Sequence, residues 1–273
     1  MIYRADAAFK SVQISGPTLA APPSTTNTWW TNWLKAVASN NVIPDQYAYH
    51  LEYGLTNPNN DPQNSNATLN SLLSTYKLPQ RQINVNEYGV KEEQVPSGAA
   101  WWIARLERYR MIGLRGNWAS GTELHDLMAN LLTKRSNPAA YTATDHAPAA
   151  EFPVYAYYNL NMTGNRVATT GSTDRNLDAY ATVGKDKVRI LVGAHVMTGT
   201  WTLEIDSMSS VGLPASGTVK VQTYAFPGTA AITNVAPATL NQGVVSHSYS
   251  NNVLSLAVNQ KDTATAYAFE FAV

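Results

Sequence analysis

The chain has 273 residues, of which 44% are hydrophobic and 14% are charged, and its 19 basic side chains balance its 19 acidic ones. This hydrophobic content argues against a disordered chain, and the zero net charge argues against a nucleic-acid-binding protein. No apolar run approaches the roughly 18 residues of a membrane-spanning helix, so a soluble protein is expected. The absence of cysteine excludes disulfides, thiolate metal sites and a cysteine nucleophile.

Strands and helical patterns alternate over the first half of the chain. The expected strands cover residues 12–16, 46–52, 83–87 and 114–118, and the expected helices cover residues 30–37, 69–76, 99–111 and 124–131. Such strand–helix units predict parallel strands joined by helical crossovers. A closed (β/α)8 barrel needs eight units and about 250 residues. We therefore predict a partial (β/α)8 barrel, about the last four βα units, over residues 1–145.

The hydrophobic pattern changes to a period of two in the second half. Alternating apolar side chains mark expected strands at residues 188–192, 201–205, 219–223, 254–258 and 267–273. Short strands of this kind, separated by Gly, Pro, Asn and Ser, predict an antiparallel β-sandwich over residues 146–273. The fold class is therefore α/β plus all-β, in two domains.

The predicted barrel strands are followed by side chains that suit a sugar. Active sites of (β/α)8 barrels lie at the carboxyl ends of the strands. The residues expected there are His50, Glu52, Tyr53, Asn86, Glu87, Asn117 and Trp118. Aromatic rings can stack on the CH groups of a pyranose ring, and the polar side chains can hydrogen-bond to its hydroxyl groups. The sequence thus predicts a carbohydrate as the partner.

Several short motifs resemble the C-terminal half of a clan A retaining glycoside hydrolase, closest to family 39 and its fungal relatives. They are Gly16-Pro17-Thr18, Tyr49-His50-Leu51-Glu52-Tyr53, Val85-Asn86-Glu87-Tyr88-Gly89, Asn117-Trp118 and the segment Tyr155–Gly164 before the β-rich tail. The resemblance implies hydrolysis of O-glycosides by a retaining mechanism, with Glu87 as the nucleophile. It also implies that Asn86, His50, Asn117 and Trp118 bind the substrate. Tyr53 and Glu52 are added as substrate-binding candidates from their place at the same strand end, although Glu52 could instead pair with a Lys or Arg side chain.

The sequence departs from this family at the acid/base residue, which usually follows an Asn and precedes a Pro after the fourth strand. No Asn-Glu-Pro occurs here, so we expect a truncated protein whose acid/base residue lay upstream of residue 1. In a second registration, Glu87 itself would be the acid after the fourth strand, but four further strand–helix units should then follow and only one does. The alternative function is a non-catalytic carbohydrate-binding or interaction protein derived from a glycosidase.

Localisation and assembly are also expectations. The parent family is secreted, and two sequons, at Asn66 and Asn161, agree weakly with a secreted glycoprotein. The N-terminus has no apolar signal-peptide region. No cofactor is expected, and no His, Asp and Glu cluster has metal-ligand spacing in the sequence. A half barrel leaves strand edges uncovered, so a homo-oligomer through the open side is predicted.

The strand that carries Glu87 poses a problem of orientation. Strict alternation places Ile83, Val85 and Glu87 on one side and Asn84 and Asn86 on the other. Either a bulge near Asn86 turns Glu87 into the barrel mouth, or Ile83 and Val85 fill the barrel interior beneath it. We predict the second arrangement, because branched side chains commonly fill barrel layers. If Glu52 lies at the retaining separation from Glu87, weak hydrolase activity is expected.

Overall fold

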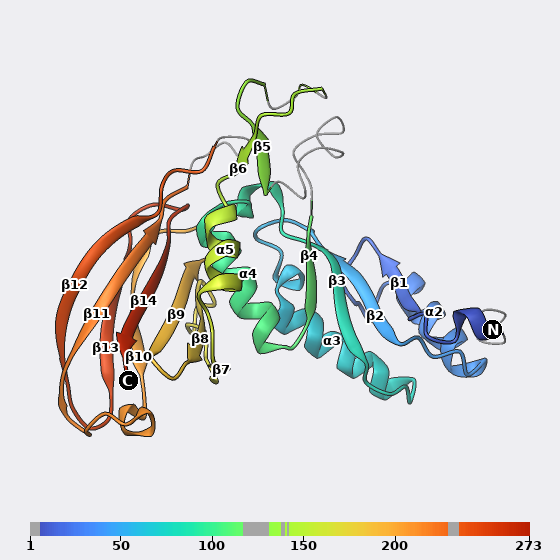
Figure 1. Ribbon diagram of the computed structural model, residues 1–273. Coiled ribbons are helices and arrows are strands. Elements are labelled where there is room, and N and C mark those ends of the chain that lie inside the picture. The colour runs from blue at the N-terminus through green and yellow to red at the C-terminus, as the bar shows by residue number, and fades with distance from the viewer. Residues whose placement is uncertain (1–5, 117–130, 138–139, 141, 229–234) are drawn as a thin grey trace. The chain divides into compact units, whose positions relative to one another are not determined.

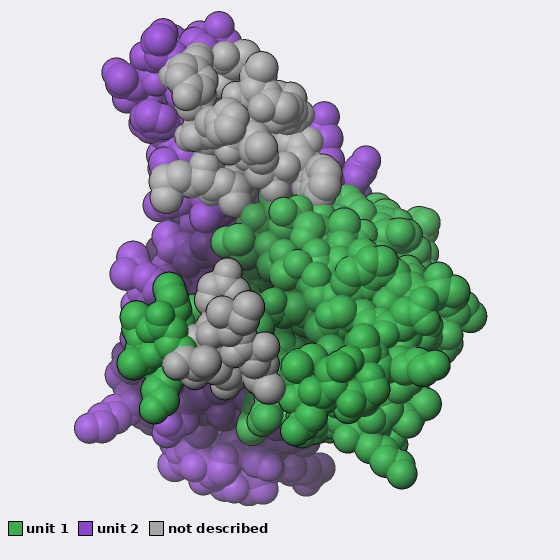
Figure 2. Space-filling view, turned by 90° about the vertical axis from the view of Figure 1, so that its right-hand side faces the viewer, with its two compact units in different colours: residues 1–90, 109–116 green, residues 91–108, 117–273 purple. Residues whose placement is uncertain are grey.

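The computed structural model describes residues 6–116, 131–137, 140, 142–228 and 235–273. The chain forms two compact units, coloured separately in Figure 2. Unit 1 comprises residues 1–90 and 109–116, and unit 2 comprises residues 91–108 and 117–273. Residues 91–108, which the sequence places within the βα repeats, thus group with the C-terminal part of the chain. Within the described residues, no helix is long and apolar enough to cross a membrane.

Unit 1 is built on a four-stranded parallel sheet (Figure 1). Its strands, in both spatial and chain order, are β1 (Ser15–Leu19), β2 (Gln46–Leu51), β3 (Gln82–Tyr88) and β4 (Ile112–Arg115). The crossover helices α2 (Thr28–Ser39) and α3 (Pro62–Thr75) connect the first three strands, and short 3-10 helices lie at Ala7–Phe9 and Pro58–Asn60. The predicted parallel βα arrangement is therefore present. The helix expected at 124–131 lies outside the described residues.

Side-chain caps explain where helices α2 and α3 begin, and the spacing of apolar residues explains which face α2 buries. The Asn27 side chain accepts a hydrogen bond from the Trp29 backbone N–H and caps α2. Asp61 caps α3 in the same way, with Pro62 at the first helical position. On α2 the buried side chains are Trp30, Leu34 and Val37, at the spacing that defines one helix face. Helix α2 packs on β2, where the Tyr47 ring lies edge-on to Trp33 and the Tyr49 ring lies edge-on to Trp30.

Unit 2 contains two larger antiparallel sheets, and the period-two pattern predicts several of their strands. The larger sheet has six strands in the order β12-β11-β14-β9-β8-β7, and the smaller sheet pairs β10 with β13. Their bounds are β7 (Asn165–Arg166), β8 (Leu177–Val183), β9 (Lys187–Ala194), β10 (Gly199–Ile205), β11 (Gly217–Phe226), β12 (Leu240–Tyr249), β13 (Leu254–Gln260) and β14 (Ala266–Ala272). All of these pairings are antiparallel. Of these strands, β7, β8 and β12 were absent from the sequence prediction.

Unit 2 also contains two helices and several short elements. These are α4 (Pro96–Arg108), α5 (Phe152–Leu160), the strand pair β5 (Leu132–Lys134) and β6 (His146–Pro148), and 3-10 helices at Lys91–Glu93 and Met208–Val211. Helix α4 contacts β8 and β9 (Figure 1). Gly193 makes this close approach possible, because a Cβ atom there would lie 2.2 Å from the Ser97 carbonyl oxygen. The Ser97 side chain donates to the Ala194 carbonyl at 2.8 Å and ties the helix to the strand.

A buried ion network joins α4 to β8 within unit 2. The Asp178 carboxylate is fully buried and lies 2.9 Å from Nε of Arg105, itself only 1% exposed. Arg108 reaches the same carboxylate and donates to Oδ2 at 2.6 Å. Two guanidinium groups therefore neutralise one carboxylate, and Arg108 donates hydrogen bonds to both of its oxygens, as a charge removed from water requires.

Candidate active site in unit 1

The candidate site forms where β2 and β3 end, and a β-bulge decides which side chains reach it. Tyr47 pairs with Ile83 and Tyr49 pairs with Val85, but the next pair is His50 with Glu87. Asn86 is thus an extra residue on β3, and it shifts the alternation of the side chains by one.

The bulge corrects the predicted orientation of the strand. Tyr47 and Tyr49 face the helices, so their strand partners Ile83 and Val85 face the helices as well. The prediction that Ile83 and Val85 fill the interior beneath Glu87 is therefore wrong. The bulge near Asn86 is the arrangement that the structure adopts, and it places Glu87 on the face that carries His50.

His50 is the centre of the site. The Asn86 side-chain amide lies 3.0 Å from Nε2 of the imidazole. When this amide nitrogen donates to Nε2, the ring proton resides on Nδ1. Nδ1 lies 3.4 Å from Oε2 of Glu87 and 3.6 Å from Oε2 of Glu52. One imidazole edge therefore faces two carboxylates, and it can offset part of their mutual repulsion.

The two carboxylates lie close to each other but differ in accessibility. A carboxylate oxygen of Glu52 and one of Glu87 lie within 4.8 Å. The Glu87 side chain is 40% exposed, whereas that of Glu52 is only 7% exposed. A ligand in solution can therefore reach Glu87 directly. Glu52 lies behind the surface, where it contacts His50.

The structure brings together four of the predicted site residues: His50, Glu52, Asn86 and Glu87. Tyr53 follows Glu52, but its side chain is 55% exposed and makes no hydrogen bond within the described residues. The Tyr53 backbone N–H donates to the side chain of buried Asn60. Asn117 and Trp118 lie outside the described residues.

The cluster of His50, Glu52 and Glu87 also contains a metal-ligand set that the sequence reading did not anticipate. One ligand atom from each residue lies within 4.8 Å of the other two. One feature of the sequence could have revealed part of this cluster: His50 and Glu52 are two residues apart, so both side chains lie on one side of the strand end. Glu87 joins them only through strand pairing and the bulge, which local spacing does not reveal.

Another titratable pair, in unit 2, also escaped the sequence reading. Glu93 is fully buried and its carboxylate lies 2.5 Å from Nε2 of His195, whose ring stacks on Trp101 at 3.9 Å. The two residues are 102 positions apart, so no local pattern connects them.

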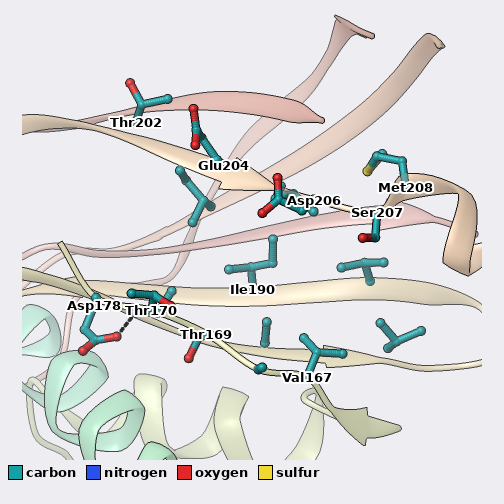
Figure 3. A pocket seen from close by; sticks show the side chains of 18 of the residues that line it. Val167, Thr169, Thr170, Asp178, Ile190, Thr202, Glu204, Asp206, Ser207 and Met208 are labelled. Atoms are coloured by element: carbon teal, nitrogen blue, oxygen red, sulfur yellow. Dashed lines mark hydrogen bonds between the residues drawn. The ribbon is translucent and has the colours of Figure 1, made fainter. Parts of the chain in front are cut away.

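A cavity of about 570 Å³ in unit 2 has a different character (Figure 3). Its lining is largely apolar, including Ile190 and Met208, and its polar members include Thr170 and Glu204. Strand β10, which contributes to the lining, pairs with β13 on one side and has no strand on the other among the described residues. Asp178 also lines this cavity, but its charge is neutralised by Arg105 and Arg108. The cavity is therefore chiefly a gap at the edge of the smaller sheet.

Known proteins resemble this chain at the level of structure. No protein-family model matches the chain, and no curated protein matches it. Solved structures do match. A protein from Neocallimastix frontalis is 19% identical with a TM-score of 0.76, and the match covers 99% of this chain and 62% of that one. A glucosidase from Croceicoccus marinus is 14% identical with a TM-score of 0.59, over 99% of this chain and 62% of that one.

A third solved structure is that of an enzyme from a numbered glycosidase family. The family 51 α-L-arabinofuranosidase of Bifidobacterium longum is 12% identical with a TM-score of 0.52, over 97% of this chain and 60% of that one. The fold resembles that of glycoside hydrolases. This chain spans about three fifths of the length of these solved proteins. The likeness concerns the fold, because all three identities are below 20%.

Proposed function

We propose that unit 1 carries the nucleophile site of a retaining glycoside hydrolase, with Glu87 as the nucleophile and a carbohydrate as the substrate. The observation that supports this most is the bulge at Asn86, which presents an accessible carboxylate beside His50 at the carboxyl end of a parallel strand. The family 39 resemblance of the motif Val85–Gly89 and the glycosidase-like fold both favour the same role.

In the proposed reaction, a Glu87 oxygen attacks the anomeric carbon and the bond to the leaving oxygen breaks. A retaining enzyme also requires an acid that protonates the leaving oxygen and later activates water, with the two carboxyl groups about 5–5.5 Å apart. Glu52 lies near that separation from Glu87. Its small exposure makes it a poor acid for a bulky leaving group.

The proposed activity therefore depends on the leaving group. General acid catalysis typically contributes about 10²- to 10⁴-fold. This chain should act slowly on ordinary glycosides, which need a protonated leaving group, and faster on aryl glycosides whose leaving group departs as an anion. We propose that Glu52 supplies the weak residual acid, and that no Asn-Glu-Pro acid contributes from within these 273 residues.

Covalent trapping tests the nucleophile without requiring the acid. A panel of 2,4-dinitrophenyl 2-deoxy-2-fluoroglycosides is incubated with the protein, and peptides are analysed by mass spectrometry. The expected result is one sugar per chain on the peptide that contains Glu87, and no label in Glu87→Gln. Glu92→Gln is the matched control, because Glu92 is an exposed glutamate outside the site. Labelling at another residue, or equal labelling of Glu87→Gln, would refute the proposal.

A carbohydrate-binding role without turnover is the second candidate, favoured by the burial of Glu52. It predicts that oligosaccharides shift NMR signals of residues around His50 while no panel member is hydrolysed. Glu87→Gln would then change the affinity for oligosaccharides, and neither wild type nor variant would show turnover. The trapping experiment distinguishes the two roles, because a protein that only binds sugars acquires no covalent label.

A further inference from the structure

The three titratable side chains of the site have the composition of a transition-metal site. An imidazole nitrogen and two carboxylate oxygens are ligands that Zn²⁺ accepts, and zinc sites with three protein ligands keep a further position open for water or substrate. His50, Glu52 and Glu87 offer this set from two adjacent strand ends. The backbone of β2 and β3 holds the three residues in place, so a metal would find most of its ligands already assembled.

The distances are close to those required. Ligand atoms about 2.0–2.1 Å from one tetrahedral zinc ion lie about 3.3 Å from each other. Nδ1 of His50 is 3.4 Å from the Glu87 oxygen and 3.6 Å from the Glu52 oxygen. The two carboxylate oxygens lie within 4.8 Å of each other. Glu87 is the most exposed of the three ligands, so its side chain has room to rotate toward a bound ion.

Asn86 supplies the outer contact that such a site needs. A metal-bound imidazole donates its other ring N–H to an acceptor, which fixes the tautomer. The Asn86 amide already lies 3.0 Å from Nε2 of His50, and its Oδ1 is buried without a hydrogen-bond partner. Rotating this amide by 180° brings Oδ1 to Nε2 as the acceptor and leaves Nδ1 free for the metal.

We propose that His50, Glu52 and Glu87 bind one divalent transition-metal ion of the Zn²⁺ class, and that this ion blocks the reaction of Glu87 with sugars. The metal-binding part rests on geometry alone, whereas the blocking part rests on the proposed function of Glu87. An oxygen bound to the metal cannot attack an anomeric carbon, so metal and sugar compete for the same carboxylate.

Isothermal titration calorimetry with ZnCl₂ in metal-free buffer tests the binding directly. The expected stoichiometry is one zinc ion per chain. Affinity should fall at least about 10-fold in His50→Gln and in Glu87→Gln, since even the loss of an outer-shell partner costs about 10- to 100-fold. His247→Gln is the matched control, because it removes a histidine from β12 and should retain wild-type affinity. Glu87→Gln is the safer variant for folding, because its side chain is the most exposed of the three.

The two parts of the proposal fail in different ways. Equal zinc affinity in wild type, His50→Gln and Glu87→Gln, or no binding to the wild type, overturns the metal site whatever the trapping experiment shows. Binding that depends on His50, together with no sugar label on Glu87 in metal-free buffer, supports the metal site and refutes the proposed function. When zinc binds through His50 and the sugar labels Glu87 in metal-free buffer, added zinc should slow this labelling in wild type and in His247→Gln alike. Unchanged labelling at saturating zinc overturns the competition.

Discussion

Replacing Asp178 by Asn tests whether the ion network between α4 and β8 holds unit 2 together. The substitution preserves the size of the side chain and removes its charge. It also places an amide N–H₂ group, which only donates, toward the guanidinium groups of Arg105 and Arg108. The variant would lose the 2.9 Å contact with Arg105 and the 2.6 Å hydrogen bond from Arg108. In their place, the amide N–H groups of Asn would face the N–H groups of the two arginines.

The burial of these groups determines the size of the effect. Asp178 has no exposed side-chain surface, and Arg105 is 1% exposed, so water cannot replace the lost partner. Removing one member of a buried ion pair costs about 3–5 kcal/mol, because the remaining charge is left uncompensated. For a protein of this size, each kcal/mol lowers Tm by roughly 2–4 °C. We therefore expect the Tm of unit 2 to fall by roughly 6–20 °C.

Thermal unfolding followed by circular dichroism measures this shift. Asp186→Asn is the matched control, because Asp186 is 58% exposed and pairs with Arg189 at the surface, at 2.6 Å. Water can replace that partner, so Tm should stay near the wild-type value. Equal shifts in Asp178→Asn and Asp186→Asn would refute the reasoning that burial makes the Asp178 network important.

Three further outcomes are expected. The Gly193→Ala protein should be less stable by roughly 1–3 kcal/mol in urea unfolding, because its new Cβ would overlap the Ser97 carbonyl; a wild-type midpoint would contradict the close packing of α4 on β9. Burial and the hydrogen bond to Glu270 raise the pKa of Tyr157, so its contribution to stability is complete below the unfolded-state pKa of about 10 and is lost as the pH rises above it. Tyr157→Phe should therefore lose less stability than wild type between pH 9 and pH 11, whereas the exposed control Tyr53→Phe should follow wild type. Light scattering at micromolar concentration should show a dimer or larger oligomer, through the exposed strand β4 with Ile112 and Leu114; a monodisperse monomer would count against it.

Much of the secondary structure follows from local patterns in the sequence. The spacing of Trp30, Leu34 and Val37 predicted the buried face of α2, because the period of an α-helix is fixed by backbone geometry. Alternation predicted β9, β10, β13 and β14 in the same way. Strand β12 was missed because most of its side chains are exposed, including Val244 and Val245. A strand with little buried surface has no reason to alternate.

The candidate site was only partly readable from the sequence. Spacing placed His50 and Glu52 on one side of a strand end, and motif likeness singled out Glu87. The direction in which Glu87 points depends on the register between β2 and β3, where Asn86 is the unpaired residue. A bulge reflects the pairing of two strands separated by an entire helix, so alternation within β3 gave the wrong face for Ile83 and Val85. Only the tertiary structure could decide that Glu87 joins His50, because one extra residue in a ladder reverses every side chain beyond it.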